Sequence, residues 1–124
     1  MRQFFPLLIV FAAGPLAAQI ITGSIAGRIE DPGGAVVPDA QVTLTRVATG
    51  LARQAKSNLS GEFVFTGLDA GEYRLAVSKT GFKQVEKSGL VLPSGVRLAA
   101  GTIQLELGQL ADTVTVTAEA GALV

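Results

Sequence analysis

The chain has 124 residues, enough for one domain, with ten basic and ten acidic side chains and neither histidine nor cysteine. The balanced charge, without a basic stripe, argues against nucleic-acid binding, which depends on the neutralisation of phosphates. The missing histidine and cysteine exclude a disulfide scaffold, Ser–His–Asp and Cys–His nucleophiles and the usual zinc, copper and haem ligands, so we expect no cofactor and no enzyme.

Residues 1–18 have the pattern of a secretory signal peptide. Arg2 supplies a positive charge, residues 4–13 form an apolar run broken only by Pro6, and small residues end at Ala18. The apolar run is shorter than the ~20 residues that a membrane-spanning helix needs. We therefore expect an N-terminal signal helix, export of the chain and cleavage after Ala18. The alternative is an uncleaved signal that anchors the chain in the membrane.

The rest of the chain has the pattern of short strands between turns rich in glycine, proline and aspartate. Turn signals recur about every 8–12 residues, and no helical period follows Gln19, which is typical of β-sandwiches. Arg53 and Lys56 favour an edge position for the third strand, because charges resist unwanted strand pairing. A charged stretch lies later in the chain, at residues 83–87. We expect an all-β, seven-stranded antiparallel β-sandwich, with strands at 25–29, 40–45, 51–57, 63–65, 73–77, 90–92 before a turn at 93–95, and 103–107.

The few aromatic residues after the signal are expected to be structural. Phe63, Phe65 and Tyr73 fall on the apolar phase of their strands, which favours the core over an exposed sugar-binding face. Leu68, Gly71 and Tyr73 together have the spacing of a tyrosine corner, in which the hydroxyl of a buried ring bonds to nearby backbone.

Two polar motifs have both a chemical and a structural interpretation. Asp31 before Pro32 could join loop carbonyls in a Ca²⁺ site, but aspartate before proline also forms turns. Asn58-Leu59-Ser60 matches the acceptor pattern for N-glycosylation, but asparagine also favours a turn there. We expect turns at both places, and no catalytic, metal-binding or cofactor-binding residue.

An ordered series of turns and strands carries a family resemblance over residues 20–107. The matching elements are Gly23 to Ile29, Asp31-Pro32 with Gly34 to Pro38, Val42 to Thr45, Gly61 to Phe63, Leu68 with Gly71 and Tyr73, and Gly81-Phe82. Together they resemble the carboxypeptidase regulatory-like domain. The resemblance implies a transthyretin-like or Ig-like sandwich at residues 19–107, grouped with carbohydrate-binding-like folds. The zinc carboxypeptidase domain that gives the family its name is not part of the resemblance.

The segment 108–124 is expected to be a linker and tail. Its Asp-Thr-Val-Thr-Val run resembles the TonB box of TonB-dependent outer-membrane receptors. An extended, uncharged Thr/Val segment can add to the edge of a partner sheet through main-chain hydrogen bonds. The alternatives are a last sandwich strand or a plain linker. The candidate partner-binding residues are Asp112, Thr113, Val114, Thr115 and Val116.

The order of signal, sandwich and TonB-box-like run resembles the start of Oar-like TonB-dependent receptors. It implies a non-enzymatic exported interaction module in the periplasm or outer membrane of a Gram-negative-type bacterium. The module would be an accessory domain or a truncated relative of such a receptor, with a TonB-like protein as partner. It would associate with the membrane only through a larger receptor or an uncleaved signal. The alternatives are a carbohydrate-binding module, with carbohydrate as partner, and a structural or adhesive surface domain.

Overall fold

The structure, a computed structural model, describes residues 3, 21–109 and 111–118. The predicted signal peptide therefore lies, apart from Gln3, outside the described residues. The described part contains no helix that could cross a membrane. Its strands are β1 (Gly23–Glu30), β2 (Gln41–Arg46), β3 (Ala52–Lys56), β4 (Glu62–Leu68), β5 (Gly71–Ser78), β6 (Gln84–Leu92), β7 (Arg97–Gln104) and β8 (Thr113–Thr117).

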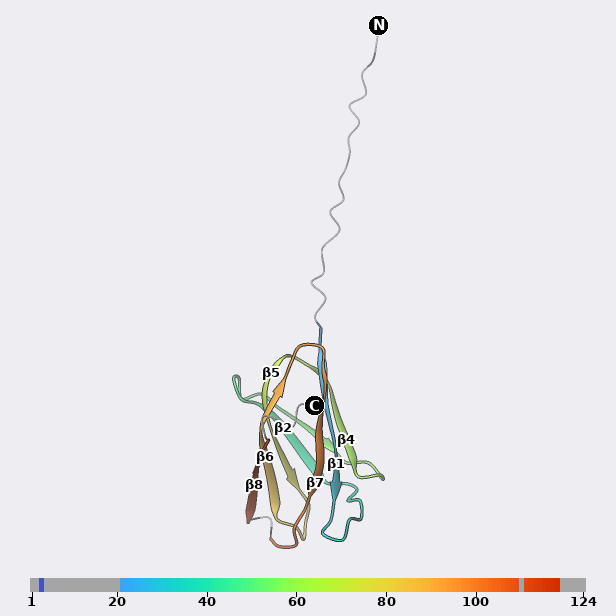
Figure 1. The fold of residues 1–124 in the computed structure, drawn as a ribbon, viewed down its shortest axis with the longest axis vertical. Helices are drawn as coiled ribbons and strands as arrows, with labels where there is room; N and C mark the ends of the chain where they lie inside the picture. The colour runs from blue at the N-terminus through green and yellow to red at the C-terminus, as the bar shows by residue number, and fades with distance from the viewer. Residues whose placement is uncertain (1–2, 4–20, 110, 119–124) are drawn as a thin grey trace.

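The strands form two sheets that face each other (Figure 1). One sheet has three strands in the order β4-β1-β7, and the other has five in the order β3-β2-β5-β6-β8. The pairs β1–β7 and β6–β8 are parallel, and the remaining pairs are antiparallel. The all-β sandwich is thus confirmed. The expected seven strands and purely antiparallel pairing were wrong, because the described residues form eight strands in mixed sheets.

Two bulges explain why two-residue periodicity misplaced the later strands. Gly89 and Gly101 have φ angles of 75° and 78°, which glycine adopts without steric cost. The strand ladders shift register beside both glycines. A bulge adds one residue to a strand and so changes which positions face the core. On β6 the buried Val85 is followed by Leu90 and Leu92, an odd and then an even spacing.

The observed strand bounds correct two expectations about particular segments. Residues 84–87 of the charged stretch belong to β6, outside the strands that we expected. The late strand covers Arg97–Gln104 instead of 103–107. Leu107, the last residue of the expected strand, is 70% exposed and joins Phe82 through an isolated bridge.

The core fills the space between the two sheets and contains the predicted aromatic side chains. Phe63, Phe65 and Tyr73 are 3%, 2% and 4% exposed, which confirms the core prediction. The two phenylalanine rings meet edge to face, with centroids 6.2 Å apart. The largest side chains with almost no exposure are Ile25, Ile29, Leu44, Leu75, Leu92 and Leu105.

The predicted tyrosine corner forms at the start of β5. The Tyr73 hydroxyl donates a hydrogen bond of 2.7 Å to the main-chain oxygen of Asp69. Arg46 of β2 holds the same corner, because its guanidinium donates a 2.9 Å bond to the carbonyl of Ala70. The two side chains therefore fix the connection between β4 and β5 from opposite ends.

Replacing Tyr73 with phenylalanine is expected to lower the free energy of unfolding by about 1 kcal/mol or more. The change removes the hydroxyl and leaves the ring and its packing in place, so the lost bond to Asp69 accounts for the effect. Thermal and urea unfolding measure it. An unchanged melting temperature would count against a stabilising role for this corner.

The two ambiguous polar motifs are turns. Oδ1 of Asp31 accepts bonds of 2.9 Å from the amides of Gly33 and Ala35. Oδ1 of Asn58 accepts bonds of 2.9 and 3.0 Å from the amides of Ser60 and Glu62. Both side chains therefore stabilise their own loops, as the turn interpretation predicted. No cluster of three metal-ligating side chains occurs among the residues that the structure describes.

Candidate interaction site

The TonB-box-like residues form the outermost strand of the five-stranded sheet. β8 pairs in parallel with β6, from Gln84 opposite Thr113 to Ser88 opposite Thr117. Asp112 lies just before the strand, and its carbonyl accepts a 2.9 Å bond from the amide of Gln84. The run expected to be a tail thus belongs, at least in part, to the sandwich. Its partner-binding role stays a prediction.

The pairing register decides which main-chain groups of β8 remain available. The amide of Ala118 donates a 2.9 Å bond to the carbonyl of Ser88. The main-chain groups of successive residues in a strand point alternately to its two sides. Given this bond and the one at Asp112, the amides and carbonyls of Val114 and Val116 point toward β6. The amides and carbonyls at the other positions point to the free side of the sheet. These positions are Thr113, Thr115 and Thr117.

The side chains of β8 divide between the core and the solvent. Val114 is half-buried and packs against the core, whereas Val116 is 42% exposed. The three threonine side chains are exposed on the opposite face. The edge is therefore uncharged along its length and apolar on its inner face.

A cleft opens between β8 and the neighbouring sheet. It has a volume of about 260 Å³ and lies where β6 and β8 face β7. Val85, Val114 and Val116 line it from one sheet, and Ile103 lines it from the other. The inner face of β8 is thus partly uncovered.

Two basic side chains reach across the sandwich to the edges of the three-stranded sheet. Arg53 of β3 donates a 2.6 Å bond to the carbonyl of Thr66 on β4, and its guanidinium lies 5.9 Å from the centre of the Phe65 ring. Lys87 of β6 donates a bond to the carbonyl of Ala100 on β7. These contacts occupy edge carbonyls that another strand would need. β3 is itself an edge strand, as predicted from its charges.

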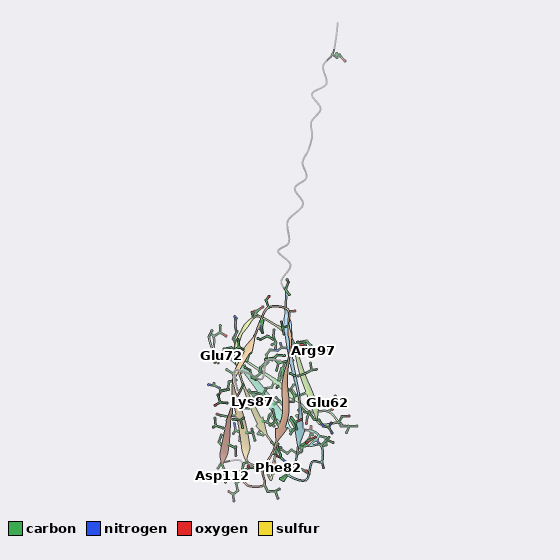
Figure 2. All side chains as sticks on the ribbon, viewed as in Figure 1. Glu62, Glu72, Phe82, Lys87, Arg97 and Asp112 are labelled. Atoms are coloured by element: carbon green, nitrogen blue, oxygen red, sulfur yellow. The ribbon has the colours of Figure 1, made fainter. Side chains whose placement is uncertain are left out.

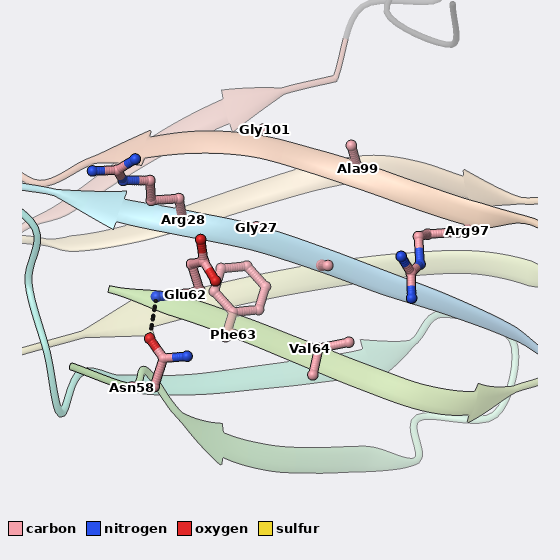
Figure 3. A pocket seen from close by; sticks show the side chains of 10 residues that line it. Gly27, Arg28, Asn58, Glu62, Phe63, Val64, Arg97, Ala99 and Gly101 are labelled. Atoms are coloured by element: carbon pink, nitrogen blue, oxygen red, sulfur yellow. Dashed lines mark hydrogen bonds between the residues drawn. The ribbon is translucent and has the colours of Figure 1, made fainter. Parts of the chain in front are cut away.

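A second hollow lies on the outer face of the three-stranded sheet (Figure 3). It has a volume of about 490 Å³ and forms where small side chains, Ala26 and Ala99, lie between longer ones. Figure 3 shows Arg28 and Arg97 on either side of this floor, with Glu62 on the neighbouring strand. Sequence reasoning missed this hollow because its residues come from strands that are distant in the chain.

Charged side chains lie at several separate places on the described part of the chain. Figure 2 shows Glu62, Glu72, Arg97 and Asp112 at separate points of the sandwich. Ion pairs join Arg28 to Glu30 at 3.3 Å and Lys83 to Glu106 at 3.8 Å. Ion pairs with this much solvent access contribute little to stability.

Several solved structures are similar to the sandwich. A streptococcal ancillary pilin matches 72% of this chain and 33% of its own at 14% identity, with a TM-score of 0.56. Hydroxyquinol 1,2-dioxygenase from Pseudomonas putida matches 71% and 57% at 10% identity, with a TM-score of 0.55. A type II cohesin–X-dockerin complex from Acetivibrio cellulolyticus matches 69% and 58% at 19% identity, with a TM-score of 0.53. At these identities the likeness concerns the fold alone.

The aligned part of this chain covers 33%, 57% and 58% of those three solved chains, which is less than two thirds of each. No curated protein shows significant sequence similarity to the chain. A family comparison, in contrast, matches residues 24–107 to the carboxypeptidase regulatory-like domain, which agrees with the order of turns in the sequence. The match covers more than half of the chain. The chain therefore belongs to the family of the carboxypeptidase regulatory-like domain.

Proposed function

We propose that the chain acts as a non-enzymatic exported interaction module whose β8 edge binds a partner protein by strand addition. The observation that carries this proposal is the free side of β8, where the amides and carbonyls of Thr113, Thr115 and Thr117 have no strand opposite them among the described residues. Main-chain groups in this arrangement give affinity without demanding a particular side-chain chemistry.

The partner we propose is a TonB-like protein, and the setting is that of an Oar-like receptor. The support is the resemblance of the run from Asp112 to Val116 to a TonB box, following a sandwich of this family. The pattern of residues 1–18 supports export to the periplasm or outer membrane. The chain would then be an accessory domain, or a truncated relative, of a larger receptor.

The described residues support a binding role over a catalytic one. The chain has no histidine or cysteine to serve as nucleophile, general base or soft-metal ligand. The one similar enzyme named above, a dioxygenase, shares only 10% identity, so its activity is not an argument for this chain. The two aspartate and asparagine motifs with chemical interpretations are engaged in their own turns.

A carbohydrate-binding role has less support. Sugar-binding faces usually present flat aromatic rings, and Phe63, Phe65 and Tyr73 are all buried. The hollow in Figure 3 is lined by alanine, glycine, polar and charged residues, together with Val64. Its one aromatic residue, Phe63, is buried in the core. Binding to a glycan array by the chain would contradict this ranking.

Calorimetric titration of residues 19–124 with the periplasmic domain of a TonB-type protein tests the proposal. We expect saturable binding that Thr115→Pro abolishes, because proline removes an amide on the free side of β8. Thr115→Val is the matched control, since it keeps that amide and should bind like the unsubstituted chain. Absence of binding, or equal binding by the proline variant, would contradict docking at this edge.

A further inference from the structure

The four edges of the two sheets are not equally open to another strand. β3 carries Arg53 and Lys56, and charged side chains on an edge strand discourage pairing. On β4, the carbonyl of Thr66 is occupied by Arg53. On β7, the carbonyl of Ala100 is occupied by Lys87, and a bulge at Gly101 interrupts the edge.

β8 carries none of these protective features within the described residues. Its sequence, Thr-Val-Thr-Val-Thr, contains no charge, proline or glycine, and its pairing with β6 runs without a register shift. An edge strand without charge, proline or bulge offers its unpaired main-chain groups to another chain unless something covers it. Threonine and valine are also both enriched in strands.

The sequence of β8, Thr-Val-Thr-Val-Thr, is palindromic. This symmetry favours a second copy of β8 as the strand that pairs with its free edge. In an antiparallel pair with a two-fold axis at Thr115, Thr113 lies opposite Thr117 and Val114 lies opposite Val116 of the second copy. Like side chains therefore meet at every position. Thr–Thr pairs can form hydrogen bonds across neighbouring strands, and Val–Val pairs bury apolar surface. The flanking Asp112 would face Ala118, so the pairing brings no like charges together.

The hydrogen-bonding register fits the same two-fold arrangement. Directly opposite residues in an antiparallel ladder alternate between pairs that exchange two main-chain bonds and pairs that exchange none. The outward groups of β8 belong to Thr113, Thr115 and Thr117, which are the residues that this axis places opposite one another. Val114 and Val116 then form the closer, non-bonded pairs, and the exposed side of Val116 is covered.

We infer that two copies of this chain associate through their β8 edges. The antiparallel β8–β8 pair would join the two five-stranded sheets into one continuous sheet. This inference does not depend on the proposed function. The two are linked, however, because a second copy and a partner strand would occupy the same edge. Self-association would therefore compete with binding of the partner.

Sedimentation velocity of residues 19–124, from about 10 μM to about 1 mM, tests this inference. We expect a monomer–dimer equilibrium. Thr115→Pro should weaken it at least about tenfold, because the central pair loses its two hydrogen bonds. Thr115→Lys should weaken it as well, because it places two like charges at the axis, and Thr115→Val should leave it unchanged. A chain that stays monomeric at the highest concentration, or a dimer insensitive to both weakening changes, would overturn the inference.

Cysteine substitution tests the register, since the chain has no cysteine of its own. Thr115→Cys should give a disulfide-linked dimer under mild oxidation, because the axis brings residue 115 of each copy opposite itself within the ~4–7 Å between Cα atoms that a disulfide spans. Thr113→Cys should not, because its opposite residue is Thr117. Equal cross-linking by the two variants would contradict the two-fold axis at Thr115.

Discussion

Replacing Leu75 with alanine is expected to lower the free energy of unfolding by about 2–5 kcal/mol. Leu75 has 0% exposure and lies on β5, the central strand of the five-stranded sheet, opposite Leu44 of β2. Removal of its side chain leaves a cavity that the flanking strands can fill only in part. A chain of this size buries a modest core and has no disulfide to compensate for the loss.

Urea unfolding, followed by circular dichroism, measures the effect of the Leu75 change. Val91→Ala is the matched control, because Val91 lies on β6 of the same sheet but is 50% exposed. We expect the control to cost about 0.5 kcal/mol or less. Equal losses for the two variants would mean that β5 is not the centre of the core.

Replacing Gly61 with alanine is expected to cost about 2–4 kcal/mol, from two causes that add together. Gly61 has a φ of 71°, which a residue with a Cβ atom adopts only with strain. An added Cβ atom would also lie 2.7 Å from the carbonyl oxygen of Ile29 and 2.9 Å from the Cβ atom of Val36. The first of these neighbours is main chain, so the connection between β3 and β4 would have to move.

Gly50 separates the two causes, because it has the same φ of 71° but no atom within 4 Å of an added Cβ. Gly50→Ala should therefore cost only the strain, about 1 kcal/mol. The difference in unfolding free energy between the two alanine variants then measures the steric part. If the two variants lose the same stability, the close approach at Gly61 has no energetic consequence.

Local patterns predicted much of the fold correctly because they depend on neighbours in the chain. The apolar phases of Phe63, Phe65 and Tyr73 identified core residues, and the spacing of Leu68, Gly71 and Tyr73 identified the tyrosine corner. Turn chemistry identified the roles of asparagine and aspartate in the loops. All these features arise from a two-residue period or from a bond within a few residues.

The features that sequence missed depend on distant segments. The bulges at Gly89 and Gly101 change the phase within a strand, so alternation alone could not follow β6 and β7. Parallel pairing of β1 with β7 joins segments more than 70 residues apart, as Ser24 opposite Arg97 shows. The contact of Lys87 with β7 likewise requires the three-dimensional arrangement of the two sheets.

The candidate site was found in part. The run from Asp112 to Val116 was recognised as a strand that could bind a partner, but its place in the sheet was left open between a tail and a last strand. The structure pairs it with β6. What the sequence could not supply is the direction of its main-chain groups, because that follows from the bonds to Gln84 and Ser88 on another strand.

Amide hydrogen exchange along β8, measured by NMR at a concentration low enough to keep the chain monomeric, tests the central claim most directly. We predict slow exchange at Val114, Val116 and Ala118, whose amides face β6, and fast exchange at Thr113, Thr115 and Thr117. Saturation with the TonB-type domain should then slow exchange at the three threonines. Threonine amides that are already protected in the free monomer, or that stay unprotected in the complex, would contradict a docking edge at β8.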